Sequence, residues 1–162
     1  MNERFLLAAA LALSAAVLSG CTASTNDDDG AAPPSAPAPS QAGVSENNLE
    51  AGQCMTDSGT AAEPNIEVLP CTEEHAFEVF ATTELPEGDY PGLGEADAQA
   101  QEFCRSEFSE FIGVEYDASE LDLQYFYPVE EEWAAEGGRS VICLVGQPAG
   151  ATAQGILEGS AR

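Results

Sequence analysis

Lysine is absent from this sequence of 162 residues, and arginine occurs four times against 29 aspartates and glutamates. The formal net charge is therefore −25 at pH 7. Nucleic-acid binding normally depends on basic side chains that neutralise phosphates, so the composition argues against that class of function. Anionic lipid would also repel the folded part, and membrane contact through a basic patch is not expected. A basic or cationic partner remains open.

Reactive side chains are scarce. His75 is the only histidine, and the chain has no Cys-x-x-Cys pair and no Gly-x-Ser-x-Gly elbow. A structural zinc site needs four ligands, and a nucleophile at Cys71 would need a free thiol and an orienting third group. We therefore expect no catalytic residue, no metal and no cofactor. The alternative kept open is an envelope hydrolase or metal-dependent enzyme centred on His75. A redox protein would need a reducible cysteine of low pKa, which no motif supports.

A long membrane-spanning run is also absent. The apolar stretch from Phe5 to Leu18 is too short for a comfortable span and is typical of a secretory signal. The following Leu18-Ser19-Gly20-Cys21 resembles the bacterial lipobox. This resemblance implies cleavage after Gly20 and a diacylglyceryl group on Cys21, with a plain signal peptide as the alternative. Two or three acyl chains, at about 0.8 kcal/mol per buried methylene, would hold the protein on a membrane.

Composition divides the chain into four parts. Residues 1–20 are the expected lipoprotein signal peptide, and residues 21–45 are rich in Pro, Ala, Ser and Asp. Such a segment buries too little apolar surface to offset its ordering entropy, so we expect a disordered linker after the lipidated cysteine. Residues 46–147 are long enough for one small domain. Residues 148–162 have the composition of a flexible tail.

The hydrophobic pattern predicts the fold class. Four segments have strand patterns: 65–70, 75–85, 120–128 and 139–147. In the second of these, Phe77, Val79 and Ala81 are expected on one face. From Glu95 to about residue 112 the apolar spacing becomes helical, and Gly113 supplies a stop. We predict an α+β domain with a small, largely antiparallel sheet packed against one helix; a short extra strand near 52–56 is left open.

Four cysteines lie within the predicted domain. Cys104 falls in the apolar stripe of the helix, and Cys143 lies in the middle of an apolar strand, so both are expected to face the core. Cys54 and Cys71 flank the first strand region. Four cysteines allow three connectivities, and sequence alone does not choose among them. The direction in which these side chains are expected to face, together with an exported location, favours two disulfides, Cys54–Cys71 and Cys104–Cys143.

Several stretches in a fixed order resemble one family. They are "GQCMTD", "VLPCTEEHAFEVFA", "YPG", a helix bearing Cys104, and "PVEEEWAAEGGRSVICLV". Together they look like the septum formation domain of envelope-associated proteins from high-GC Gram-positive bacteria. The resemblance depends on an ordered set: Gly52, Cys54, Pro70, Cys71, His75, Glu78, Pro91, Gly92, Cys104, Trp133, Gly138, Arg139 and Cys143. One departure is Glu74, where the family pattern leads us to expect proline.

The resemblance implies an extracytoplasmic, membrane-associated module without an established activity or cofactor. We expect a lipid-anchored protein on the outer face of the cell membrane, with a non-catalytic binding or structural domain. Its partner would be an envelope protein or a cell-wall component, and its oligomeric state is left open. A link to envelope growth or septum formation follows from the family name.

Six side chains are singled out within this expectation. His75 and Glu78 are candidate structural residues, and His75 is expected to fix the turn before the next strand by hydrogen bonding. Trp133 either packs over the sheet edge or is an exposed recognition residue. Arg139 either pairs with a carboxylate to fix the last strand or presents a fork to an anionic ligand. The candidate binding residues are Trp133, Arg139, Tyr125 and Tyr127.

Overall fold

The structure is a computed structural model, and it describes residues 40–57, 59–60, 63–64 and 66–162. The elements, in chain order, are β1 (Gln41–Val44), η1 (Glu46–Asn48), β2 (Cys54–Met55), β3 (Gly59–Thr60), β4 (Glu63–Pro64), β5 (Ile66–Leu69), β6 (Phe77–Glu84), α1 (Leu93–Ile112), η2 (Tyr116–Ala118), β7 (Asp122–Phe126), β8 (Ser140–Gly146) and η3 (Pro148–Gly150). Each predicted strand and the predicted helix is present to within two residues at each end. The short strand left open near residues 52–56 is β2.

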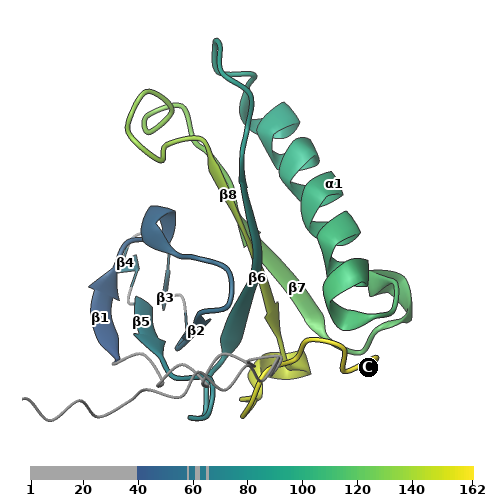
Figure 1. Cartoon of the computed structure of the whole chain (residues 1–162). Coiled ribbons are helices and arrows are strands. Elements are labelled where there is room, and N and C mark those ends of the chain that lie inside the picture. Colours follow the sequence, from purple (N-terminus) through teal and green to yellow (C-terminus); the bar gives the residue numbers. More distant parts are fainter. Residues whose placement is uncertain (1–39, 58, 61–62, 65) are drawn as a thin grey trace, which may run out of the picture. The chain divides into compact units, whose positions relative to one another are not determined.

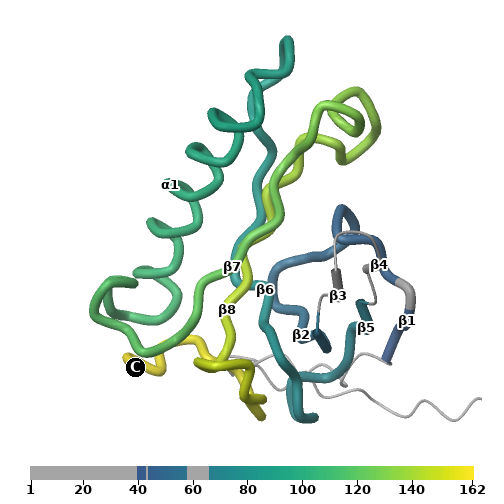
Figure 2. The backbone as a smooth tube through the Cα atoms, turned by 180° about the vertical axis from the view of Figure 1, so that it is seen from behind, coloured from purple at the N-terminus to yellow at the C-terminus, as the bar shows by residue number. Residues whose placement is uncertain are grey.

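Six strands form one curled antiparallel sheet in the order β1-β5-β2-β6-β8-β7, and β3 pairs with β4 in a separate two-stranded ribbon. Helix α1 runs along one face of the half formed by β6, β8 and β7 (Figure 1). The half formed by β1, β5 and β2 lies on the far side of β6 from the helix (Figure 2). The predicted α+β class, with an antiparallel sheet and one helix, is confirmed.

The helix face that meets the sheet follows a four-residue repeat. Its fully buried positions are Ala96, Ala100, Cys104, Phe108 and Ile112. The buried side chains are small in the first half of the helix and larger in the second. Gly113 ends the helix in the left-handed region, at φ 91°, as the sequence predicted.

Strand β8 carries apolar side chains on both faces. Val141, Cys143 and Val145 point to the cluster under α1. Ile142 and Leu144 point to a second cluster enclosed by the curled half of the sheet, which includes Leu49, Met55, Ile66, Val68 and Val79. The apolar run of β8 is continuous because this one strand contributes side chains to both clusters.

A bulge in β6 corrects one prediction. Phe77 and Val79 share the face of the second cluster, as expected, but Ala81 belongs to the cluster under α1. The register explains the difference: Val79 pairs with Leu144 and Ala81 with Cys143, so Phe80 is an extra residue on β6. One inserted residue reverses the alternation of every side chain that follows.

Two disulfides are formed, with the pairing that side-chain facing favoured. Cys104–Cys143 joins α1 to β8 and closes a sequence separation of 39 residues. Cys54–Cys71 joins β2 to the turn before β6, with a separation of 17 residues. Both Cys104 and Cys143 are fully buried, so this bond runs through the core under the helix.

The folded domain is longer than predicted at both ends. Residues 41–44, expected to be linker, form β1 and pair with β5. Residues 148–162, expected to be a flexible tail, pack on the domain instead. Ala153 exchanges two backbone hydrogen bonds with His75, Gly155 N–H donates to Cys71 O, and Leu157 is buried. Composition misled here because backbone pairing, which leaves no side-chain pattern, holds this segment.

The expected signal peptide, Cys21 and most of the linker lie outside the described residues. Within the described residues, no helix is both long enough and apolar enough to cross a membrane.

Removing the core disulfide should be costly. In the chain-entropy treatment a closure of this length contributes about 4 kcal/mol, against a total stability of about 5–15 kcal/mol for small domains. We expect the double variant Cys104→Ala/Cys143→Ala to lose about 3–4 kcal/mol in urea unfolding at neutral pH. The Cys54–Cys71 disulfide closes a shorter loop, so the variant Cys54→Ala/Cys71→Ala should lose less of the free energy of unfolding. A loss below about 1 kcal/mol for the first variant would show that helix packing alone holds α1.

Candidate functional site

Two loops meet at one end of the sheet, and we call them together the tip. The first, residues 85–92, connects β6 to α1; the second, residues 128–139, forms most of the connection from β7 to β8. Both loops project beyond the same end of strands β6 and β8 (Figure 1). The glycines and prolines of the first loop are typical of a turn-rich connection, and the tip contains the candidate binding residues Trp133 and Arg139.

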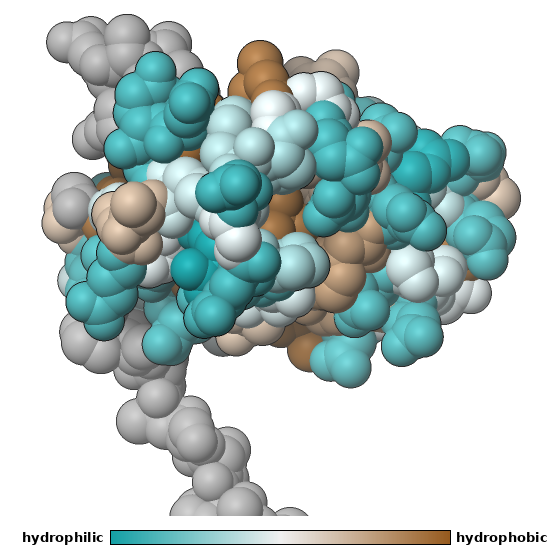
Figure 3. All heavy atoms as spheres, turned by 90° about the horizontal axis from the view of Figure 1, so that it is seen from above, coloured by the Kyte–Doolittle hydropathy of each residue, from teal (hydrophilic) through white to brown (hydrophobic). Residues whose placement is uncertain are grey.

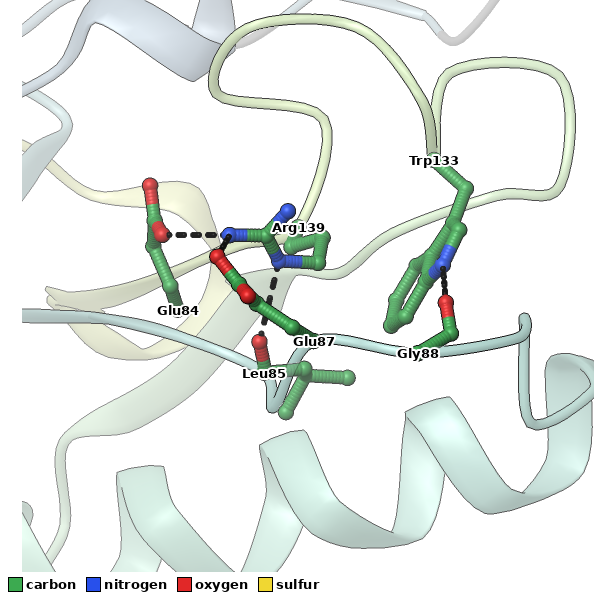
Figure 4. Close-up of polar contacts among 6 residues, drawn as sticks. All are labelled: Glu84, Leu85, Glu87, Gly88, Trp133 and Arg139. Atoms are coloured by element: carbon green, nitrogen blue, oxygen red, sulfur yellow. Dashed lines mark hydrogen bonds and ion pairs between the residues drawn. The ribbon is translucent and has the colours of Figure 1, made fainter.

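Arg139 ties the two loops to the sheet. Its Nη2 lies 3.1 Å from Glu84 Oε2 and 3.8 Å from Glu87 Oε1, and its Nε donates to Leu85 O at 3.2 Å. Leu85 N–H in turn donates to Arg139 O at 2.9 Å. Figure 4 shows the guanidinium held between these three partners. Of the two roles predicted for Arg139, its contacts are those of the structural one, a pairing that fixes the start of β8.

Trp133, in the second loop, contacts the first loop. Its Nε1–H donates to Gly88 O at 2.8 Å (Figure 4), and its ring meets Tyr90 edge-on with centroids 5.4 Å apart. Tyr90 OH donates to Pro128 O at 3.4 Å, which gives a second link between the loops. Partial burial, followed by the nearby charge of Glu130, raises the pKa of Tyr90. The indole therefore braces the tip and remains half-exposed there.

Gly138 is required for the shape of the second loop. It is buried, and a Cβ at this position would lie 1.8 Å from Glu132 O, closer than any real contact. Successive turns in the loop are closed by hydrogen bonds such as Ala135 N–H to Glu132 O at 2.8 Å and Gly138 N–H to Ala135 O at 3.1 Å. The close approach of backbone to Gly138 lets the chain fold back and bring Trp133 over Gly88.

Tyr125 and Tyr127, the other candidate binding residues, lie on β7 and directly after it. Their rings lie 5.9 Å apart, and both pack against the cluster under α1. Tyr125 OH donates to Asp97 Oδ1 at 2.9 Å. Burial and this aspartate together raise the pKa of Tyr125. Tyr125 thus fastens β7 to α1, and both rings are half-buried.

A second group of polar residues is buried near the other end of β6. His75 is 1% exposed, and its Nδ1 lies 2.9 Å from Glu73 O. A carbonyl can only accept, so Nδ1 carries the proton in this contact. His75 Nε2 has no hydrogen-bond partner in the described part of the chain. Glu78, 2% exposed, accepts from Leu157 N–H at 2.8 Å through Oε2.

This group is the nearest approach to a metal site among the described residues. Potential ligand atoms of Cys54, His75 and Glu78 lie within 4.8 Å of one another. Cys54 is bonded to Cys71, however, so its sulfur is not a thiolate. One imidazole nitrogen and one carboxylate remain, fewer than the four ligands of a structural zinc site. With the disulfide formed, the group is a buried polar cluster under the C-terminal segment.

Burial dominates the electrostatics of Glu78. Desolvation raises the pKa of its carboxyl, and the bond from Leu157 N–H and the proximity of His75 partly oppose that rise. The charge of Glu158 adds a smaller upward contribution. The C-terminal segment therefore covers an acid that holds its proton to higher pH than an exposed glutamate does.

Sequence reasoning missed part of the tip. Leu93 is 55% exposed at the start of α1, and Tyr90 meets Trp133 edge-on, but neither was selected as a candidate. The available signal was "YPGLG", in which apolar and aromatic residues sit within a turn-rich segment. Such a segment indicates a connection, and its apolar residues do not stand out as a surface because loops carry no hydrophobic period that marks exposure.

The fold defines a small α+β domain closed by two disulfides, with a braced loop tip at one end. The family model described as Septum formation matches residues 18–151. The chain belongs to the septum formation family. No curated protein and no solved structure matches it.

Adding a methyl group at Gly138 should distort the tip. We expect Gly138→Ala to lower the free energy of unfolding by about 2 kcal/mol or more, because backbone must move to relieve the overlap. Gly94→Ala is the matched control: its Cβ would meet nothing within 4 Å, and we expect a change within about 1 kcal/mol. Urea unfolding followed by tryptophan fluorescence and circular dichroism measures both. Equal stability of the two variants would contradict the described turn.

Glu78 should make stability depend on pH in a defined direction. Its folded pKa lies above the ordinary value of 4.5, so the folded state binds more protons than the unfolded state in the window between the two. The stability that Glu78 contributes is therefore fully present below its unfolded pKa and is lost as pH rises through the folded one. Glu78→Gln keeps an acceptor for Leu157 N–H and removes the titration.

We expect the stability of Glu78→Gln relative to the wild type to increase from about pH 4 to about pH 7. Glu73→Gln, at an exposed position, controls for the loss of one charge. The measurement is urea unfolding at a series of pH values. A relative stability that falls with pH over this range would show that burial does not control this carboxyl.

Proposed function

We propose that this protein is a lipid-anchored, extracytoplasmic member of the septum formation family whose domain binds an envelope component and performs no catalysis. Membership of the family suggests a role in cell division or the cell envelope. The lipobox-like Leu18-Ser19-Gly20-Cys21 supports anchoring through Cys21. The partner is proposed to be a protein or a wall component close to the membrane.

The observation that carries the binding role is the contrast between the buried group around His75 and the exposed tip. His75, the one histidine, is enclosed and only 1% exposed, and the four domain cysteines are paired in disulfides. In the alternative, a hydrolase centred on His75, a substrate would have no access to the imidazole. The tip, in contrast, presents a braced aromatic pair and the exposed Leu93. Exposed aromatic and apolar residues on a rigid support are common centres of binding.

Photo-cross-linking in the native envelope tests this proposal. A photoreactive amino acid replaces Ala134, which is exposed in the second loop of the tip, and as a control Glu110, which is exposed on α1. We expect a discrete adduct from position 134 and not from position 110, identified by mass spectrometry. The same experiment with Cys21→Ala should lose the adduct, because the anchor holds the domain near its partner.

Two results would contradict the proposal. Equal adducts from positions 134 and 110 would show that the tip is not the binding surface. An undiminished adduct in the Cys21→Ala chain would show that anchoring is not needed for the encounter.

A further inference from the structure

The tip is hollowed on both sides of the Tyr90–Trp133 pair. An open hollow of about 590 Å³ is lined by Tyr90, Pro91, Leu93, Val129, Glu130 and Glu131. A smaller one of about 150 Å³ is lined by Trp133, Pro91, Glu87 and Asp89, among others. Pro91 is common to both, so the two hollows adjoin. Viewed from this end, apolar surface lies exposed between hydrophilic side chains (Figure 3).

Four carboxylates line the two hollows, and among them Glu87 alone has a basic partner in the described part of the chain, Arg139. In the described part of the chain every arginine is already engaged: Arg105 with Asp117, Arg139 with Glu84 and Glu87, and Arg162 with Glu120. No ion pair is formed there by Asp89, Glu130 or Glu131, and all three are exposed. The hollows therefore combine apolar contact with negative charge that the chain itself does not neutralise.

We propose that the two adjoining hollows of the tip form a binding groove for a lysine- or arginine-bearing segment of another protein. The inference rests on the proposed binding role and specifies the chemistry of the partner. Apolar residues of the segment pack on Leu93 and Val129. Its cationic side chains lie between the aromatic pair and the carboxylates of Glu130 and Glu131 in one hollow, and Asp89 in the other.

Charge complementarity favours a partner with cationic side chains. A protein with a net charge of −25 and no lysine attracts basic partners over distances comparable to the Debye length, about 8 Å in physiological salt. Aromatic rings add to this at short range, because an ammonium or guanidinium group is stabilised over the face of a tyrosine or tryptophan. Trp133 and Tyr90 are held in place by bonds to Gly88 O and Pro128 O, so little ordering is needed on binding.

The backbone favours a peptide over a simple cation. Gly92 and Leu93, at the start of α1, line the larger hollow. The first turn of a helix leaves backbone N–H groups without intrahelical acceptors, and these can donate to carbonyl oxygens. A peptide offers both carbonyl acceptors and basic side chains, whereas a polyamine or a lysine-bearing lipid headgroup offers mainly the charge.

The test measures binding of a defined peptide to the full-length lipidated protein in neutral nanodiscs. The probe is a fluorescent extended peptide in which lysine alternates with leucine, and its control is the same peptide with every lysine acetylated. Anisotropy is recorded in about 150 mM salt, which weakens non-specific attraction to the acidic surface. We expect saturable binding of the lysine peptide and at least about tenfold weaker binding of the acetylated one.

Two pairs of variants locate the site. Glu130→Gln/Glu131→Gln should weaken binding by about fivefold to thirtyfold, the upper part of the range for two exposed ion pairs. Glu73→Gln/Glu74→Gln removes the same charge from another exposed glutamate pair and should leave affinity within about twofold. Leu93→Ala should weaken binding by about fivefold. Ile156→Ala is its control, because Ile156, 63% exposed, is the other exposed large hydrophobic among the described residues.

Equal losses in the tip variants and their controls would overturn the inference, since binding would then reflect net charge alone. Spermidine that competes as well as the peptide, or lysyl-phosphatidylglycerol vesicles that bind more tightly than it, would also overturn it and assign the groove to a small cation or a lipid. Because an adduct in the envelope experiment needs no particular charge on the partner, cross-linking at position 134 without peptide binding would leave the binding role standing and remove only this assignment.

Discussion

Strand β8 is the constraint on which the rest of the domain depends. It pairs with β6 and β7, and its alternating side chains supply both apolar clusters. One face is bonded covalently to α1 through Cys143, and Arg139, immediately before the strand, joins β8 to Glu84. Because the two cores share this strand, loss of packing on one face weakens the support for the other. The tip depends on the same strand, since its second loop runs directly into β8.

The sequence predicted those parts of the fold in which side chains repeat with a regular period. The helix face from Ala96 to Ile112 and the apolar run of β8 agree with the structure because burial there follows directly from spacing. The reversal at Phe80 was not predictable, since a bulge depends on the register with β8 and not on the residues of β6 alone. The packing of residues 153–161 was missed because backbone hydrogen bonds to His75, Phe111 and other distant residues hold them, and these leave no pattern in composition.

The candidate site was likewise predicted in part from the sequence and completed only by the fold. Trp133 and Arg139 were identified as residue types with chemistry to offer, and the structure brings them to one end of the sheet. The contacts of both residues are structural: Arg139 fixes the start of a strand, and Trp133 holds two loops together. Leu93 and Tyr90, which complete the exposed surface, lie in a loop and at a helix start, where hydrophobicity does not indicate orientation. The three-dimensional fold was needed to place them beside Glu130 and Glu131.

Trp133 is the sole tryptophan in the chain. It lines the smaller hollow and contacts Tyr90, which lines the larger one, so the domain carries its own optical probe. Selective excitation of indole reports on this end of the molecule, while the phenylalanines and tyrosines of the core stay largely silent. The emission depends on the Tyr90 ring and on the bond to Gly88 O, so a molecule that settles in either hollow changes the colour or yield without any attached dye. The same signal separates local loosening of the loops from global unfolding, which circular dichroism of the backbone follows independently.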